Sequence, residues 1–242
     1  MKQVFKKILS QLGYDIRTRN FLQLHEIRRI KFLNDHNISL VLDVGSNEGQ
    51  YAQSIRREGY KNRIISFEPV KQIFEILHKK KINDSKWQAM NIAIGDFDGS
   101  TSINISEFSQ VSSILSATGL AHTEYWKGYR QEEIKVRKLD SLINELDIKE
   151  QRILLKVDTQ GFEEKVLQGS QNLIDQNIDL LEVELSIQPF YLDEKLFPEM
   201  FTYIRDFNFE LISMSPVHID SVRGYVLQYD CIFIKKSILD SE

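Results

Sequence analysis

Short apolar runs alternate with longer helical segments along most of this chain, and this alternation constrains the fold more than any other feature. Strands buried on both faces have continuous apolar runs, and helices between them connect parallel neighbours. No helix is expected between the last two runs. We therefore predict a doubly wound, mostly parallel seven-stranded α/β sheet with an antiparallel edge hairpin and N-terminal helices. The predicted strands are residues 40–44, 63–67, 90–94, 153–157, 180–185, 209–214 and 228–235.

The parallel strands of such a sheet end at one edge, and ligands bind outside that edge in this fold class. Residues 101–105 alternate in polarity and predict a hairpin extension, whereas residues 106–133 look irregular and polar. The edge therefore directs attention to the residues that end predicted strands. These are Asp43, Glu68, Ile94, Asp158 and Glu184.

Positive charge is concentrated at the N-terminus. The chain has 242 residues and a net charge of −4, but residues 1–31 contain eight Lys or Arg and two acidic residues. The segment lacks the apolar core of a secretory signal. We divide the chain into a basic helical segment, residues 1–37, and one domain, residues 38–242. The short apolar face of the first helix favours packing on the domain, and weak contact of residues 1–31 with an anionic membrane surface is the alternative.

Composition predicts a protein of a reducing compartment. No apolar run approaches the roughly 20 residues of a membrane span. The single cysteine, Cys231, excludes an internal disulfide. We expect a cytoplasmic protein, peripheral to the inner face of the membrane if the basic segment binds lipid. The overall charge does not indicate a dedicated nucleic-acid binder, so no nucleic-acid partner is expected. The sequence leaves the oligomeric state open.

Two glycines lie four residues apart after the first strand, in the sequence LDVGSNEGQY of residues 42–51. Glycine permits a tight turn and close approach of a ligand, and the following helix offers N–H groups to it. The spacing is not the G-x-G-x-x-G of dinucleotide sites. Because Asp43 and Glu48 flank the loop, it repels pyrophosphate and attracts a cation. An NAD-dependent enzyme is therefore the disfavoured alternative.

The second strand ends in SFEP, residues 66–69, which places Glu68 19 residues after Gly49. An acidic residue at this spacing can accept hydrogen bonds from both hydroxyls of a ribose. With the glycine loop, it predicts a site for a nucleoside that carries a cationic amino-acid group. The alternative is two ordinary turns and a surface glutamate.

These residues resemble the FkbM family of S-adenosylmethionine-dependent methyltransferases. The resemblance extends from about residue 38 to residue 236, and the order and spacing of its pieces are specific. The pieces are LDVGSNEGQYA (42–52), SFEP (66–69), AIGD (93–96), SSIL (112–115), VRKLDSL (136–142), LLKVDTQGFEEKVLQG (154–169), EVELSIQPFY (182–191) and LQYDCIFI (227–234).

The resemblance implies a Rossmann-like class I methyltransferase domain over residues 38–242. Its reaction would move a methyl group from S-adenosyl-L-methionine to a hydroxyl oxygen of a small molecule, such as a sugar or natural product, or of a glycan. A non-catalytic S-adenosylmethionine-binding module is the alternative. The residues expected to bind the cofactor are Asp43, Gly45, Ser46, Asn47, Glu48, Gly49, Tyr51, Glu68, Pro69, Ala93, Ile94 and Asp158.

Methylation of a hydroxyl requires a base, and three residues are candidates for catalysis. Asp158 ends the fourth strand with Lys156 on the same face, a pairing that suits binding better than proton abstraction; the alternative is a helix N-cap. Glu184 ends the fifth strand, where burial would raise its pKa; the alternative is a structural partner. His122 lies in the variable middle region, and the alternative there is an inert loop histidine.

Four further residues are candidates for acceptor binding. Ser112 and Ser113 can orient a hydroxyl, and Trp126 and Tyr191 can stack on a sugar face. The alternatives are turn capping and ordinary packing. The histidines lack the spacing of a metal site, so no metal is expected.

Overall fold

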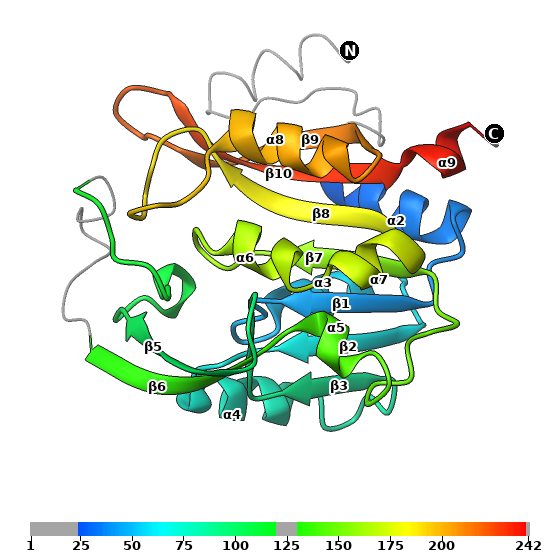
Figure 1. The fold of residues 1–242 in the computed structure, drawn as a ribbon, viewed down its shortest axis with the longest axis horizontal. Helices are drawn as coiled ribbons and strands as arrows, with labels where there is room; N and C mark the ends of the chain where they lie inside the picture. Colours follow the sequence, from blue (N-terminus) through cyan, green and yellow to red (C-terminus); the bar gives the residue numbers. More distant parts are fainter. Residues whose placement is uncertain (1–23, 120–129, 241–242) are drawn as a thin grey trace, which may run out of the picture.

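The computed structural model describes residues 24–119 and 130–240. Its centre is a seven-stranded sheet in the order β3-β2-β1-β7-β8-β10-β9 (Figure 1). The strands are β1 (Leu40–Val44), β2 (Arg63–Phe67), β3 (Trp87–Met90), β7 (Ile153–Val157), β8 (Ile178–Ser186), β9 (Phe209–Ile219) and β10 (Val226–Lys235). The first five strands in this order run parallel, whereas β10 is antiparallel to both β8 and β9. The predicted sheet with its antiparallel edge hairpin is confirmed.

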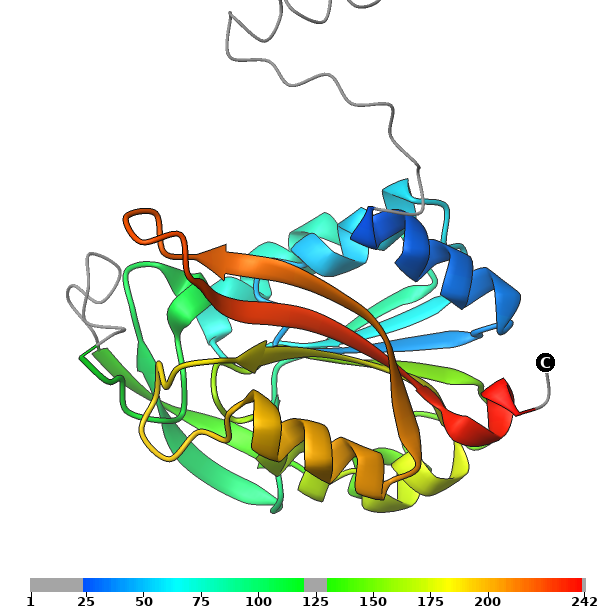
Figure 2. The ribbon, with the colours of Figure 1, turned by 90° about the horizontal axis from the view of Figure 1, so that it is seen from above.

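Helices cover both faces of this sheet (Figure 2). One face carries α2 (His25–Asp35), α3 (Gln50–Arg57) and α4 (Lys71–Lys80). The other carries α5 (Leu139–Leu142), α6 (Glu163–Gln168), α7 (Gln171–Gln176) and α8 (Phe197–Asp206), and a short α9 (Lys236–Leu239) follows β10. Adjacent strand residues such as Val41 and Leu42 enter opposite cores, as the two-residue period of a strand requires.

A second, three-stranded sheet was not predicted. It has the order β4-β6-β5 and consists of β4 (Ala93–Ile94), β5 (Gly99–Ile105) and β6 (Arg130–Arg137). The predicted single strand 90–94 is therefore two strands in different sheets. The side-chain amide of Asn91 donates to the carbonyl oxygens of Glu68 and Pro69 at 2.9 and 2.8 Å, which turns the chain out of the first sheet after β3. The predicted irregular region also ends early, because β6 begins at Arg130.

A row of polar side chains crosses the main sheet on the face that α2 and α3 cover. Asp43 of β1 lies in register with Ser66 of β2 and with Lys156 of β7. Lys156 is in register with Glu182 of β8, and Asp230 of β10 lies opposite Glu184. This row leads from the middle of the sheet to the carboxyl ends of its parallel strands.

The N-terminal segment is described only from residue 24, and its helix α2 packs on the main sheet. The basic residues before α2 lie outside the described part. Within residues 24–119 and 130–240, no helix has the length and apolar character needed to cross a membrane. The division of the chain at residue 37 stays a prediction.

Candidate active site

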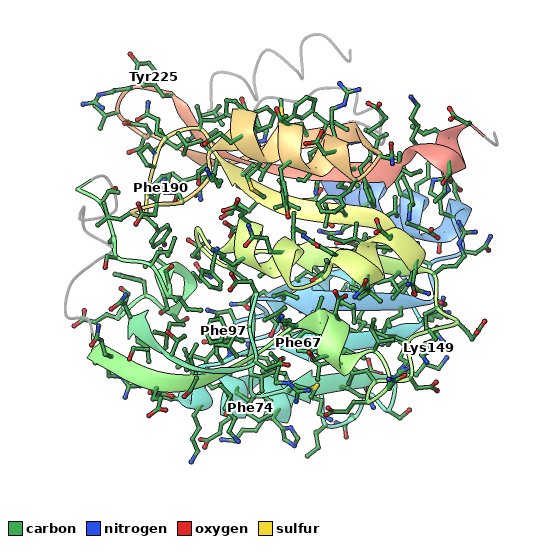
Figure 3. The ribbon with its side chains drawn as sticks, in the orientation of Figure 1. Phe67, Phe74, Phe97, Lys149, Phe190 and Tyr225 are labelled. Carbon is green, nitrogen blue, oxygen red and sulfur yellow. The ribbon has the colours of Figure 1, made fainter. Side chains whose placement is uncertain are left out.

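A cavity of about 340 Å³ opens at the carboxyl ends of the parallel strands, where the ligand site was expected. The loops after β1, β2 and β7 form most of its wall. The end of β8 adds Glu184, and the β9–β10 hairpin adds Val217, His218 and Gln228. Figure 3 places that hairpin by its label on Tyr225 and marks Phe67 and Phe190. This hairpin is a contribution that strand-end reasoning did not identify.

The glycine loop brings two strand ends into backbone contact. Gly45 has a φ of +78°, and a Cβ atom there would lie 1.8 Å from the carbonyl oxygen of Asp158. The N–H groups of Gly45 and Ser46 donate to the carbonyl of Phe67. These two amides therefore serve the fold. Ser46 Oγ, by contrast, is buried in the cavity wall without a hydrogen-bond partner in the described part of the chain.

Glu68 lies at the end of β2 and is 5% exposed. Its two carboxylate oxygens accept the backbone N–H groups of Val70 at 2.8 Å and Asn47 at 2.9 Å. Burial raises the pKa of Glu68 to about 7 against the lowering effect of these two bonds. Each oxygen keeps a lone pair, so the carboxylate can also accept two hydroxyl groups from the cavity.

Asp43 and Lys156 form the floor of the cavity. Burial raises the pKa of Asp43 to about 6, although Lys156 and a 2.8 Å hydrogen bond from Ser66 Oγ lower it. Four carboxylic acids line the cavity, and Lys156 is the one Lys or Arg among the described lining residues. Such a wall attracts a cation and disfavours a phosphate.

Asp158 and Glu184 face each other across a shared amide. Gln160 Nε2 donates to Asp158 Oδ1 at 2.9 Å and to Glu184 Oε2 at 3.0 Å. Asp158 is also ion-paired with Lys156 at 3.0 Å. Burial raises the pKa of Glu184 well above its usual range, and Asp158 and Asp230 raise it further.

Two residues hold this pair in place from outside the predicted set. Gln228 Nε2 donates to Glu184 Oε2 at 3.0 Å, and Gln160 sits in a left-handed turn with a φ of +57°. Tyr191 was expected to stack on a sugar, but it is 2% exposed and donates from its hydroxyl to Gln160 Oε1 at 2.9 Å. The turn signal Gln160-Gly161 after a strand could have identified Gln160, whereas no local signal identifies Gln228.

Most of the predicted site residues meet in this one cavity. Those that line it are Asp43, Gly45, Ser46, Asn47, Tyr51, Glu68, Pro69, Ala93, Ile94, Ser112, Asp158 and Glu184. Those that the structure places elsewhere are Glu48, Gly49, Ser113 and Tyr191. Those outside the described residues are His122 and Trp126.

The predicted residues away from the lining have structural contacts. Glu48 is ion-paired with Lys80 at 2.8 Å. Gly49 has a φ of +83° and precedes α3, and a Cβ atom there would lie 2.6 Å from Leu77. Ser113 donates to the carbonyl oxygen of Gln160 at 2.6 Å. These contacts hold the fold around the cavity.

The cavity fits S-adenosylmethionine on three observations. Its volume is within the range of small-molecule sites. Its wall carries an excess of carboxylates for a ligand with a sulfonium and an ammonium group. Glu68 is placed to accept two hydroxyl groups, and Ser46 Oγ offers an unused polar atom.

Known proteins resemble the chain at two levels. The methyltransferase FkbM domain model matches residues 43–211. No curated protein matches the chain in sequence. Among solved structures, magnesium protoporphyrin IX methyltransferase from Synechocystis PCC 6803 with bound S-adenosylmethionine is 12% identical, with a TM-score of 0.47 over 97% of this chain and 96% of that one. Aeropyrum pernix fibrillarin in complex with S-adenosyl-L-methionine is 10% identical, with a TM-score of 0.48 over 81% of this chain and 66% of that one.

The family match spans β1 to β9, and so includes the glycine loop, Glu68, Asp158 and Glu184. It supports the cofactor expected from the sequence, S-adenosylmethionine, rather than NAD. The chain belongs to the FkbM methyltransferase family.

Proposed function

We propose that this protein is an O-methyltransferase whose acceptor is a hydroxyl group of a sugar, glycan or natural product. The observation that carries the proposal is the position of Glu184. This carboxylate of raised pKa lines the same cavity as the glycine loop and Glu68, and two amide side chains hold it. A hydroxyl acceptor needs such a base.

The residues around the glycine loop would hold the cofactor. Glu68 would accept the two ribose hydroxyls, and Asp43 and Asp158 would face the positive charges of the cofactor. When bound, S-adenosylmethionine supplies an electrophilic methyl group. Pro69, Ala93 and Ile94 give this part of the cavity an apolar side. An apolar wall excludes water, which strengthens the attraction between the carboxylates and a cation.

Glu184 would accept the proton that the acceptor hydroxyl loses as it takes up the methyl group. Its Oε2 atom already accepts bonds from Gln160 and Gln228, and a raised pKa makes its ionised form a stronger base. Asp158 is less suited to this step because Lys156 contacts its Oδ2 atom at 3.0 Å and Gln160 donates to its Oδ1 atom at 2.9 Å.

The acceptor would lie between Glu184 and the loop of residues 109–114. Ser112, Gln160 and Gln228 offer hydroxyl and amide groups there, and His218 comes from the hairpin. No Lys or Arg of the described lining faces this side to pair with a phosphate, since Lys156 already pairs with Asp158. This chemistry favours an uncharged polyhydroxylated acceptor over a nucleic acid.

A labelled cofactor tests the proposal while the acceptor is still unidentified. The protein is incubated with S-adenosylmethionine that carries an isotopically labelled methyl group, together with glycan and metabolite extracts. Mass spectrometry should find a labelled product in which the methyl group is bound to oxygen. Glu184→Gln should slow the labelling by about a hundredfold or more while binding of S-adenosylhomocysteine is retained. Label on nitrogen, or labelling by Glu184→Gln at the wild-type rate, would contradict it. Glu210→Gln, on the far end of β9, is the matched control.

A further inference from the structure

Helix α2 ends at Asp35 and so lies outside the family match of residues 43–211, yet it buries charged side chains beside the cavity. We infer that α2 contributes to the cofactor site. Its side chains hold Glu182 in place, and Glu182 in turn positions Tyr51. The inference rests on the proposed function in one respect, namely that Tyr51 forms part of the wall that contacts the cofactor. Glu182 is in this sense a positioning residue.

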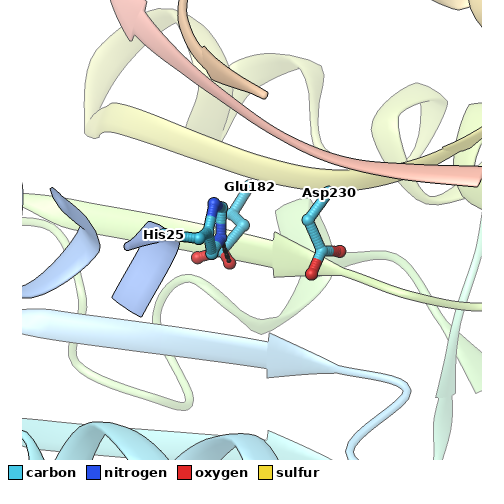
Figure 4. Close-up of side chains that lie close together, drawn as sticks. All are labelled: His25, Glu182 and Asp230. Atoms are coloured by element: carbon cyan, nitrogen blue, oxygen red, sulfur yellow. Dashed lines mark hydrogen bonds and ion pairs between the residues drawn. The ribbon is translucent and has the colours of Figure 1, made fainter. Parts of the chain in front are cut away.

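Glu182 is fully buried in β8, and both of its carboxylate oxygens are in use. His25 Nε2 lies 3.1 Å from Oε1, and an Arg29 guanidinium nitrogen lies 3.4 Å from the same atom. The hydroxyl of Tyr51 donates to Oε2 at 2.6 Å. Figure 4 shows His25 and Glu182 joined by their hydrogen bond, with Asp230 beside them. Two residues of α2, His25 and Arg29, therefore contact one oxygen of the Glu182 carboxylate, and Tyr51 donates to the other.

Burial alone would raise the pKa of Glu182, but His25, Arg29 and Tyr51 lower it to about 2. Burial and Glu182 raise the pKa of Tyr51, so its hydroxyl remains a donor. The bond between the two residues therefore joins an anion to a neutral donor inside the protein. Hydrogen bonds to charged groups are stronger than those between neutral groups. A buried charged group that loses one of its hydrogen-bond partners therefore costs considerable stability.

Tyr51 is in the first turn of α3 and lines the cavity. The Arg29 guanidinium carbon lies 4.8 Å from the centre of its ring, and Lys156 Nζ lies 5.5 Å from that centre. Arg29 also donates to both oxygens of Glu58, which follows the last turn of α3, at 2.6 and 2.8 Å. Helix α2 and β8 together fix α3 at both ends. Because α3 directly follows the glycine loop, its position sets the shape of the cofactor site.

Binding of S-adenosylhomocysteine, measured by calorimetry, tests this coupling without an acceptor. Tyr51→Phe removes one hydroxyl and keeps the ring. Glu182→Gln removes the negative charge that the Tyr51 hydroxyl and the two α2 residues contact, so the bond between residues 51 and 182 is no longer charge-assisted. Each variant should weaken binding by about tenfold, the effect of one hydrogen bond to a charged group. The double variant should bind S-adenosylhomocysteine no more weakly than the single variant with the lower affinity, because both changes act on the same hydrogen bond between residues 51 and 182.

Arg28→Ala is the matched control, since Arg28 is also on α2 but donates to Ser213 Oγ at 2.9 Å. It should bind S-adenosylhomocysteine as the wild type does. Wild-type affinity in Tyr51→Phe and Glu182→Gln, or losses that add in the double variant, would overturn the inference. A purely structural role would lower the melting temperature without this non-additive loss of affinity. If the wild-type protein binds neither S-adenosylmethionine nor S-adenosylhomocysteine, the proposed function itself fails.

Discussion

At the scale of single residues, Glu68 gives the sharpest test of the cofactor site. Both of its oxygens accept a backbone N–H group, so glutamine at this position must turn its NH2 group toward one of those donors. Glu68→Gln should therefore weaken S-adenosylmethionine binding by about tenfold or more in calorimetry. Glu75→Gln on the exposed side of α4 is the control. Unchanged affinity in Glu68→Gln would remove Glu68 from the ribose.

The sequence could predict the charged residues of the site better than the uncharged ones. Asp43, Glu68 and Glu184 were predicted because they end strands at the edge of the sheet where ligands bind in this fold class, and the cavity opens at that edge. Gln228 was missed because it comes from the antiparallel strand β10, where the strand-end rule does not apply. Tyr191 was expected in the acceptor site, but a buried tyrosine must satisfy its hydroxyl, and the partners it reaches are Gln160 Oε1 and the carbonyl oxygen of Val111.

At the scale of secondary-structure elements, the loops that follow β1 and β7 are in direct backbone contact. Gly45 and Gly59 both have positive φ, but only Gly45 has a backbone atom in the way of a Cβ, whereas Gly59 has nothing within 4 Å. Gly59→Ala should lower the melting temperature by about 2–4 °C, the effect of about 1 kcal/mol of backbone strain. Gly45→Ala should lower it considerably more and abolish cofactor binding. Equal shifts in calorimetric melting would mean that the loops can move apart.

Six of the seven strands of the main sheet were predictable because each contains a run of apolar residues, whereas β3, with the sequence WQAM, has no such run and its bounds were predicted wrongly. The second sheet was not predictable, because β4 has only two residues and its partner β6 begins 36 residues after the end of β4. No local pattern encodes a pairing of that separation. The break between β3 and β4 depends on Asn91, whose two hydrogen bonds are tertiary contacts. Strands with a local apolar pattern were predicted, and strands that depend on a partner far away in the sequence were not.

At the scale of the whole molecule, the cavity brings together buried acidic side chains. When these side chains ionise, the folded protein becomes less stable. Burial raises the pKa of Asp43 to about 6 and that of Glu68 to about 7. Between the unfolded pKa near 4 and these values, the folded state binds more protons than the unfolded state, so its free energy of unfolding falls as pH rises. Glu182 acts in the opposite direction only at low pH, because its folded pKa of about 2 lies below the unfolded value.

The cofactor should reverse this loss of stability, since its positive charge favours the ionised carboxylates. The ligand-free protein should melt at a lower temperature at about pH 7.5 than at about pH 5.5. Saturating S-adenosylmethionine should raise the melting temperature more at the higher pH, because binding to the folded state is linked to loss of these protons. S-adenosylhomocysteine lacks the sulfonium charge, so the difference between its effects at the two pH values should be smaller. Calorimetric melting of the ligand-free and the two ligand-bound forms at both pH values measures this. Equal stabilisation by S-adenosylmethionine at both pH values would show that the carboxylates of the cavity do not respond to the charge of the cofactor.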